Sequence, residues 1–310
     1  MQSLFKSYLP NELRSAIYPI EQVDISHFID HPTYLLSAKN SIKSHLTEKE
    51  LVGLHLLIGD EAVGKTTFVT NLAIQNIIKG NGLFFTDLYG KKQTLERIKH
   101  AVDFANRGSD LIEIDISVDR LATNGKTKFL EKVRELERVN WKDIISNKKI
   151  LLITGNLKDT EYSPNFVYYL REIFADLVKD LTSVFNKKHL INKNLFLIHL
   201  DEAELYVDTH NYLHKLTTLA EHNKLCLMCS FKVFNTYYTH IYGIEINHSE
   251  MAHLYKMGHS YLFRLTDYYS LAFLETKLDK YTLNRVKRLQ LGEYIIPAHH
   301  NRKEETFLIV

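Results

Sequence analysis

The sequence has few of the residues that mark long loops, disulfide frameworks or membrane spans. Its 310 residues include only 2 cysteines, 5 prolines and 12 glycines, a composition that predicts an ordered globular protein without long linkers. No run approaches the roughly 18 consecutive apolar residues that a membrane helix needs. The amino terminus also lacks the basic start and apolar run of a secretory signal. We therefore expect a cytoplasmic chain with no transmembrane segment of its own.

An excess of one charge is also missing. The 39 lysines and arginines nearly balance 37 aspartates and glutamates, for a net charge of +2, so bulk attraction to nucleic acid is not expected. Any DNA contact has to come from a local basic patch. One segment, 278–290, is a candidate, and it gathers Lys280, Tyr281, Arg285, Lys287 and Arg288. This pattern predicts either a nucleic-acid contact or, more commonly, a solvated surface.

Two pairs of residues have the spacing of metal or redox motifs. Cys226 and Cys229 lie in an apolar run that predicts a β-strand, where positions i and i+3 face opposite sides. We therefore interpret them as buried structural residues. His210 and His214 have the i, i+4 spacing of a helical metal pair, but no third ligand is evident, which favours a surface pair. His199 lies within an apolar strand pattern and is expected to be a core histidine.

The chain alternates short apolar runs with amphipathic segments, which predicts βαβ units building a mainly parallel sheet. Seven strands are expected, at 51–59, 82–88, 111–116, 148–155, 195–202, 224–230 and 260–265. Helices are expected at 66–80, with Gly80 ending the first of them, and at 164–186. The last twenty residues predict one or two further strands joined by a charged turn. Residues 1–47 are interpreted as an extension packed on a core domain of 48–310, in which 120–147 is a candidate helical insertion.

The stretch "LIGDEAVGKTTF", residues 57–68, contains a complete Gly-x-x-x-x-Gly-Lys-Thr string between a predicted strand and a predicted helix. This is the context of a phosphate loop, in which backbone amides and the helix dipole hold the phosphates of a nucleotide. Lys65 would reach the β and γ phosphates, Thr66 would ligate Mg²⁺, and Thr67 would lie near the α phosphate. The expected nucleotide-binding residues are Gly59, Asp60, Glu61, Ala62, Val63, Gly64, Lys65, Thr66 and Thr67.

A second strand, "NLFLIHLDEAE", ends in two carboxylates, Asp201 and Glu202. We expect Asp201 to hold Mg²⁺ through its water shell, and Glu202 to orient or deprotonate the water that attacks the γ phosphate. This pair favours hydrolysis over phosphorylation of a small molecule. The alternative interpretation is that both acids only cap the helix that follows.

With both motifs placed, the chain resembles the additional-strand P-loop ATPases of the HerA and FtsK type. Within that group it is similar to the coupling proteins of conjugative type IV secretion systems (TraG/TraD-like). The likeness is carried by 51–68 and 194–206 as Walker A and Walker B, by 80–117 as the second and third strands, and by 224–238 as a sensor strand. The resemblance covers roughly 50–310. It implies a RecA-like three-layer α/β sandwich with antiparallel strands added at the carboxyl terminus.

The chain departs from this family in two functional positions. The family's sensor strand commonly ends in glutamine, whereas Cys229 and Ser230 occupy the predicted strand end, so Ser230 is the candidate sensor. The family also carries an arginine shortly before that strand, and this sequence has "LAEHNKL" there. An arginine finger can raise the hydrolysis rate by orders of magnitude. Arg264 is a candidate replacement for a phosphate contact.

The resemblance implies an ATP-binding, Mg²⁺-dependent ATPase similar to the cytoplasmic motor domain of a coupling protein. It further implies a homo-oligomer, with a hexamer as one candidate assembly, and DNA or a secreted protein as the substrate. A membrane-associated secretion machinery is then a candidate partner. Two alternatives stay open: a nucleotide-binding but non-hydrolytic docking module, and an ATPase of the same superfamily that packages or segregates DNA.

Overall fold

The fold was analysed in a computed structural model of the protein. The residues it describes are 33–39, 42–88, 92–117, 135–136, 138–155, 175–176, 178–185, 194–206, 212–232, 234, 248–297 and 305–308. Of the segments considered above, 1–32, 118–134, 156–174 and His210 lie outside these residues. The division into an extension, a core domain and a helical insertion therefore stays a prediction.

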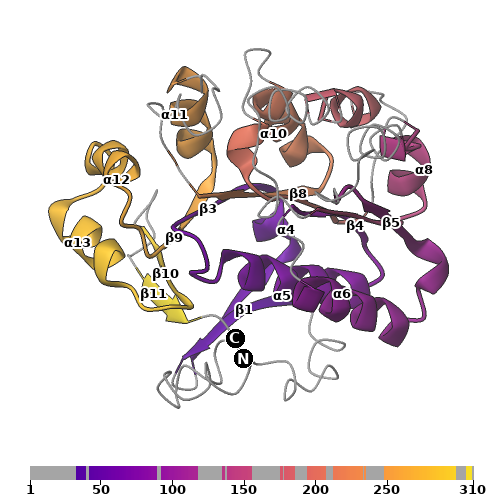
Figure 1. The fold of residues 1–310 in the computed structure, drawn as a ribbon, viewed down its shortest axis with the longest axis horizontal. Coiled ribbons are helices and arrows are strands. Elements are labelled where there is room, and N and C mark those ends of the chain that lie inside the picture. Colours follow the sequence, from indigo (N-terminus) through magenta and orange to yellow (C-terminus); the bar gives the residue numbers. More distant parts are fainter. Residues whose placement is uncertain are drawn as a thin grey trace, which may run out of the picture.

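A nine-stranded sheet forms the centre of the molecule (Figure 1). Its strand order is β11-β10-β9-β3-β8-β7-β4-β6-β5. The strands are β3 (Gly53–Ile58), β4 (Gly82–Asp87), β5 (Leu111–Asp115), β6 (Ile150–Thr154), β7 (Phe196–Leu200), β8 (Leu225–Phe231), β9 (His259–Phe263), β10 (Glu293–Ile296) and β11 (Glu305–Leu308). Neighbouring strands are parallel throughout the part of the sheet that runs from β9 through β3, β8, β7, β4 and β6 to β5. Strand β10 pairs antiparallel with both β9 and β11. The seven strands predicted from the apolar runs and the terminal antiparallel strands are confirmed.

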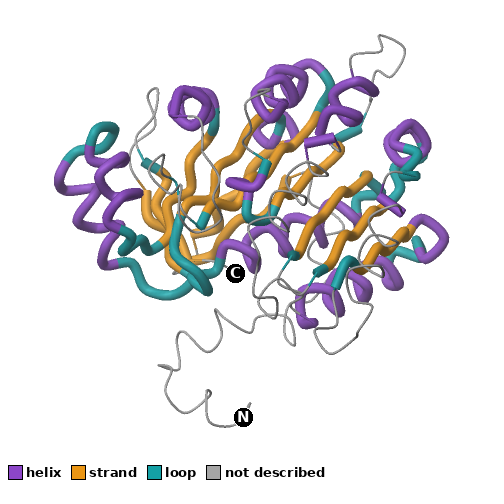
Figure 2. The backbone as a smooth tube through the Cα atoms, turned by 45° about the horizontal axis from the view of Figure 1, so that its top comes forward, coloured by secondary structure: helices purple, strands orange, loops and turns teal. Residues whose placement is uncertain are grey.

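Helices cover both faces of the sheet (Figures 1 and 2). The helices are α4 (Glu48–Leu51), α5 (Lys65–Ile78), α6 (Lys92–Phe104), α8 (Trp141–Ser146), α10 (Tyr212–His222), α11 (His248–Met257), α12 (Tyr268–Glu275) and α13 (Lys280–Arg288), with 3-10 turns η2 (Gly108–Asp110) and η4 (Ala203–Leu205). Two hydrophobic clusters fill the space between the layers, one under α5 and α6 and the other under α8, α10 and α11. The predicted three-layer α/β sandwich is confirmed. Among the described residues, no helix is both long enough and apolar enough to cross a membrane.

Near-continuous apolar sequence is what a strand covered on both faces requires. In β8 every residue is buried, and its side chains alternate between the two clusters. Cys226 belongs to the cluster under α5, and Cys229 belongs to the cluster on the opposite face. Burial raises the pKa of both thiols. The interpretation of these cysteines as structural residues facing opposite sides is therefore confirmed.

A hairpin of β1 (Thr33–Lys39) and β2 (Ile42–Thr47) forms a separate two-stranded sheet and contacts α5. The buried Tyr34 hydroxyl donates to Asn76 Oδ1 at 3.0 Å and accepts from Asn81 Nδ2 at 3.0 Å. Asn76 in turn donates from Nδ2 to the carbonyl of Gly82 at 2.8 Å. This chain of buried hydrogen bonds satisfies polar groups where α5 turns into β4.

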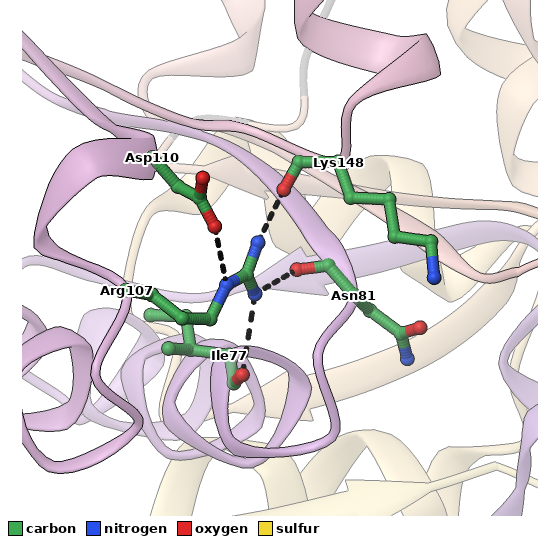
Figure 3. A network of polar contacts seen from close by, with 5 residues as sticks. All are labelled: Ile77, Asn81, Arg107, Asp110 and Lys148. Carbon is green, nitrogen blue, oxygen red and sulfur yellow. Dashed lines mark hydrogen bonds and ion pairs between the residues drawn. The ribbon is translucent and has the colours of Figure 1, made fainter.

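Arg107 forms hydrogen bonds with several elements near the amino-terminal ends of the parallel strands (Figure 3). Its Nη1 donates to the carbonyl oxygens of Ile77 (3.2 Å) and Asn81 (2.6 Å), and its Nη2 donates to that of Lys148. The Nε atom donates to Asp110 Oδ2 at 2.9 Å. The planar guanidinium therefore satisfies three backbone acceptors from the α5–β4 and α8–β6 connections at once.

Candidate functional site

The loop between β3 and α5 contains two residues with left-handed backbone conformations. Gly64, which precedes the first residue of α5, has φ 114°, and Ala62 has φ 56°. Left-handed residues in such a loop turn successive backbone amides toward a common centre, which forms an anion-binding concavity at the helix N-terminus. The Lys65 ammonium folds over this loop and donates to the carbonyl oxygens of Gly59 and Asp60, both at 2.6 Å.

Gly59 is required by the neighbouring strand. A Cβ atom at this position would lie 2.6 Å from Phe263 Cβ and 3.1 Å from the Arg264 carbonyl oxygen. Such contacts are closer than packed atoms permit, so any side chain would push β9 away from β3. The backbone amide of Asp60 also donates to the Arg264 carbonyl at 2.9 Å. The first glycine of the motif therefore fixes the loop against the end of β9.

Two acidic side chains, Asp201 and Glu202, lie directly after β7, and both are buried. The backbone amide of Asp201 donates to Thr86 Oγ1 at 2.8 Å, and this hydroxyl donates to the His199 carbonyl at 3.1 Å. Thr86 thereby locks the end of β4 to the end of β7. The chain then turns sharply, because Glu202 adopts a left-handed conformation with φ 51°. Such strained positions in non-glycine residues cluster at functional sites.

The electrostatic environment of Glu202 favours its protonated form. Burial is the largest cause that raises its pKa, followed by the carboxylates of Glu204 and Asp201. The ammonium groups of Lys65 and Lys232 act in the opposite direction. Glu202 therefore lies within electrostatic reach of the phosphate-loop lysine, as the sequence predicts for two residues that act on one nucleotide. A carboxyl whose pKa is raised is a stronger base once it is ionised.

Strand β8 lies between the phosphate-loop strand β3 and the carboxylate strand β7. Its last residue, Phe231, is level with Ile58 of β3, and Phe231 accepts a hydrogen bond from the amide of Gly59 at 3.2 Å. On the other side, Cys229 is level with Leu200, the residue that precedes Asp201. The register thus brings the phosphate loop, the end of β8 and the carboxylate pair together at the carboxyl-terminal ends of the parallel strands.

Ser230, the candidate sensor, lies one residue before the end of β8. Its hydroxyl is within 3.0 Å of His199 Nε2, and both side chains are buried. Burial lowers the pKa of His199 to about 3, which identifies it as the neutral core histidine expected from the sequence. The residue that follows the strand is Lys232, whose ammonium lies 2.7 Å from Glu61 Oε1 in the phosphate loop.

Sequence reasoning missed Lys232 and Thr266. The strand was predicted to end one residue too early, and element boundaries carry errors of this size. Thr266 follows β9 and donates to the Asp60 carboxylate, from its amide at 3.0 Å and from its hydroxyl at 2.7 Å. No local pattern marks Thr266, because 206 residues separate it from Asp60.

Two further candidates lie outside this group of residues. Helix α13 buries Leu283 and Val286 and leaves Tyr281 70% exposed, with Arg285 stacked 5.6 Å from the centre of its ring. The His214 ring contacts that of His253, with ring centroids 5.1 Å apart. Among the described residues, no group of three or more histidine, cysteine or acidic side chains is arranged to hold a metal on its own. A magnesium ion here would need phosphate and water ligands besides one or two protein oxygens.

No family model and no curated protein sequence matches this chain. Solved structures do match it. The bacterial conjugative coupling protein TrwB in its unbound form covers 92% of this chain and 90% of its own, with a TM-score of 0.59 and 10% identity. TrwB in complex with the non-hydrolysable ATP analogue ADPNP covers 93% and 92%, with a TM-score of 0.57 and 10% identity.

The genome packaging NTPase B204 from Sulfolobus turreted icosahedral virus 2, in complex with AMPPCP, covers 84% of this chain and 99% of its own, with a TM-score of 0.48 and 13% identity. The sheet places β8 between β3 and β7, and the fold matches that of TrwB with a TM-score of 0.59. The predicted resemblance to conjugative coupling proteins is therefore confirmed at the level of the fold: this chain is similar to TrwB and has the fold of a P-loop ATPase.

Proposed function

We propose that the protein is a Mg²⁺-dependent ATPase whose nucleotide lies between the phosphate loop and the carboxylates that follow β7. One observation carries this proposal. The register of β3, β8 and β7 brings Lys65 and Glu202 to one edge of the sheet, within electrostatic reach of each other. A nucleoside triphosphate held by the loop would then place its γ phosphate toward a buried carboxyl that can activate water.

Each residue of the site has a distinct role in this proposal. The amides of residues 60–67 cradle the phosphates, and Lys65 exchanges its two loop carbonyls for β and γ phosphate oxygens. The Thr66 hydroxyl and Asp201 hold Mg²⁺, directly or through water, where the ion would neutralise charge on the phosphates. Glu202 accepts a proton from the attacking water, which requires its ionised form. Lys65 and Lys232 favour that form electrostatically, against the burial and the neighbouring carboxylates that raise the pKa of Glu202.

The test is steady-state phosphate release from Mg²⁺ and ATP by the native chain and by the variants Lys65→Ala and Glu202→Gln. We expect turnover by the native chain and a loss of at least about 100-fold in both variants, since each removes a charge that acts on the transition state. Assays at several protein concentrations, with and without DNA, allow for a site that needs a neighbouring subunit. Equal rates in native and variant proteins would contradict the proposal.

A second function, a non-hydrolytic docking module, is favoured by one observation. Cys229 and Ser230 stand where the resemblance leads us to expect a glutamine, and the Ser230 hydroxyl is engaged with His199. In this alternative, bound nucleotide holds a conformation that a partner recognises. The same assay separates the two functions: a native chain that binds Mg²⁺ and ATP but releases no phosphate under any condition is a docking module.

We further propose that the protein works as a homo-oligomer that moves DNA or a protein substrate beside a membrane-associated machinery. Helix α13 supports DNA as the substrate, because it presents Tyr281 and Arg285 beside Lys280, Lys287 and Arg288. Exposed aromatic and cationic side chains together suit single-stranded nucleic acid. Binding through phosphates weakens steeply with salt. An affinity for DNA that stays constant between about 50 and 200 mM salt argues against this substrate.

A further inference from the structure

Lys232 contacts the phosphate loop from the end of β8. It is the first residue after β8, and the hydrogen bond from Gly59 to Phe231 places it beside the start of the loop. Its ammonium lies 2.7 Å from the carboxylate of Glu61. On the other side of β8, Glu202 lies within its electrostatic reach. Lys232 therefore stands between the loop and the catalytic carboxylate.

The ion pair between Lys232 and Glu61 is well suited to exchange. Its two side chains are 31% and 47% exposed, and ion pairs that are open to solvent contribute little net stability. A γ phosphate carries more negative charge than a single carboxylate and offers several acceptor oxygens. Bound triphosphate would therefore compete with Glu61 for the ammonium, whereas a diphosphate, which lacks the γ group, would compete much less.

We propose that Lys232 is a cationic γ-phosphate sensor whose ammonium exchanges Glu61 for the phosphate, so that its partner reports whether the loop holds a triphosphate or a diphosphate. This inference rests on the proposed function and goes beyond it, because it assigns to a lysine the role that the resemblance gives to a glutamine. It also moves that role from the buried Ser230 to Lys232, whose side chain is 31% exposed. Breaking the pair removes the contact between Lys232 and Glu61, which belongs to the loop itself.

The decisive property is the ratio of affinities for the Mg²⁺ complexes of AMPPNP and ADP. Lys232→Met removes the charge, and we expect AMPPNP to bind about 10- to 100-fold more weakly while ADP binding changes little. Glu61→Gln removes the competitor, and we expect AMPPNP to bind about two- to fivefold more tightly. These opposite changes in AMPPNP affinity are expected if the Lys232 ammonium exchanges Glu61 for the γ phosphate. Lys232→Arg keeps the charge and should retain most of the preference for AMPPNP.

The exposed Lys256→Met variant in α11 is a matched control for the loss of a lysine charge. Melting temperatures show whether each variant is folded, and the exposed position of Glu61 keeps that variant informative if Lys232→Met is not. If Lys232 serves only to hold the loop in shape, both variants weaken AMPPNP and ADP by the same factor, and the inference is overturned. If the native chain binds neither nucleotide, the proposed function itself fails and the inference falls with it.

Discussion

Thr266 and Asp60 are joined by three close contacts, although 206 residues separate them in the sequence. The backbone amide of Thr266 lies 3.1 and 3.0 Å from the two carboxylate oxygens of Asp60, and its hydroxyl donates to Oδ2 at 2.7 Å. Thr266 directly precedes Asp267, the N-cap of α12. A residue of the phosphate loop is therefore bonded to the segment that begins α12, whose exposed face carries Tyr268 and Tyr269.

This link predicts that Thr266 tunes the phosphate loop. Thr266→Val removes the hydroxyl bond and keeps the amide bonds, so we expect nucleotide affinity to fall about three- to tenfold, the effect of one hydrogen bond to a charged acceptor. The measurement is a fluorescence titration with a labelled ADP. Thr218→Val in α10, whose hydroxyl donates to the His214 carbonyl of its own helix, is the matched control. Equal losses in both variants would show that the effect is not specific to the loop.

Glu202 is predicted to reduce the stability of the fold at neutral pH. Because its pKa is raised in the folded state, the folded chain holds a proton that the unfolded chain releases, and stability falls as the pH rises above about 4.5. Glu202→Gln removes this loss. The unfolding free energy of Glu202→Gln should therefore exceed that of the native chain. This difference should grow by up to about 1.4 kcal/mol per pH unit until Glu202 ionises in the folded native chain.

Urea unfolding of the native chain and of Glu202→Gln at several pH values from 4.5 to 8 measures this difference. The exposed Glu135→Gln variant is the control. If Glu202→Gln is more stable than the native chain but hydrolyses ATP more slowly, then Glu202 supports activity at a cost in stability, as residues of functional sites often do. A difference that stays constant across this range would contradict the assigned direction of the pKa shift.

His199 is predicted to make the protein sensitive to acid. Burial lowers its pKa to about 3, so between about pH 6.5 and pH 3 the unfolded chain takes up a proton that the folded chain does not. Stability is therefore lost as the pH falls below 6.5. In His199→Gln the slope of unfolding free energy against pH should decrease by about 1.4 kcal/mol per unit in this window. The exposed His222→Gln variant is the control, and an unchanged slope in His199→Gln would refute this assignment.

Arg107 is predicted to be a structural residue with no part in nucleotide binding. Arg107→Leu leaves the carbonyl oxygens of Ile77, Asn81 and Lys148 without this donor, and we expect a loss of about 2–5 kcal/mol in unfolding free energy. Chemical denaturation measures it, with the exposed Arg138→Leu as control. Nucleotide affinity of the folded Arg107→Leu protein should equal that of the native chain. A specific loss of affinity would instead connect Arg107 to the site.

Local sequence patterns predicted the parts of the site whose residues are neighbours in the chain. The loop from Gly59 to Thr67 follows a buried strand and begins a helix, so its composition and context could be interpreted together. The seven parallel strands were found for a related reason: burial on both faces demands uninterrupted apolar sequence.

The remaining features depend on contacts between distant segments, which no local pattern encodes. Gly59 is constrained by Phe263, and Asp60 is bonded to Thr266. Thr86 fixes Asp201 across two adjacent strands, yet it appears in the sequence as one of many strand threonines. Lys232 was missed because β8 ends one residue later than the apolar run predicts, and its ion pair with Glu61 joins residues that are far apart in the sequence.

The most direct test of the central claim is a calorimetric titration of Mg²⁺ and AMPPNP into the native chain and into Lys65→Ala. The account predicts saturable binding of one nucleotide per native chain, and binding weakened at least about 100-fold in the variant, because Lys65 supplies charge-assisted hydrogen bonds to the phosphates. The absence of saturable binding to the native chain, or equal affinity in folded Lys65→Ala, would contradict it.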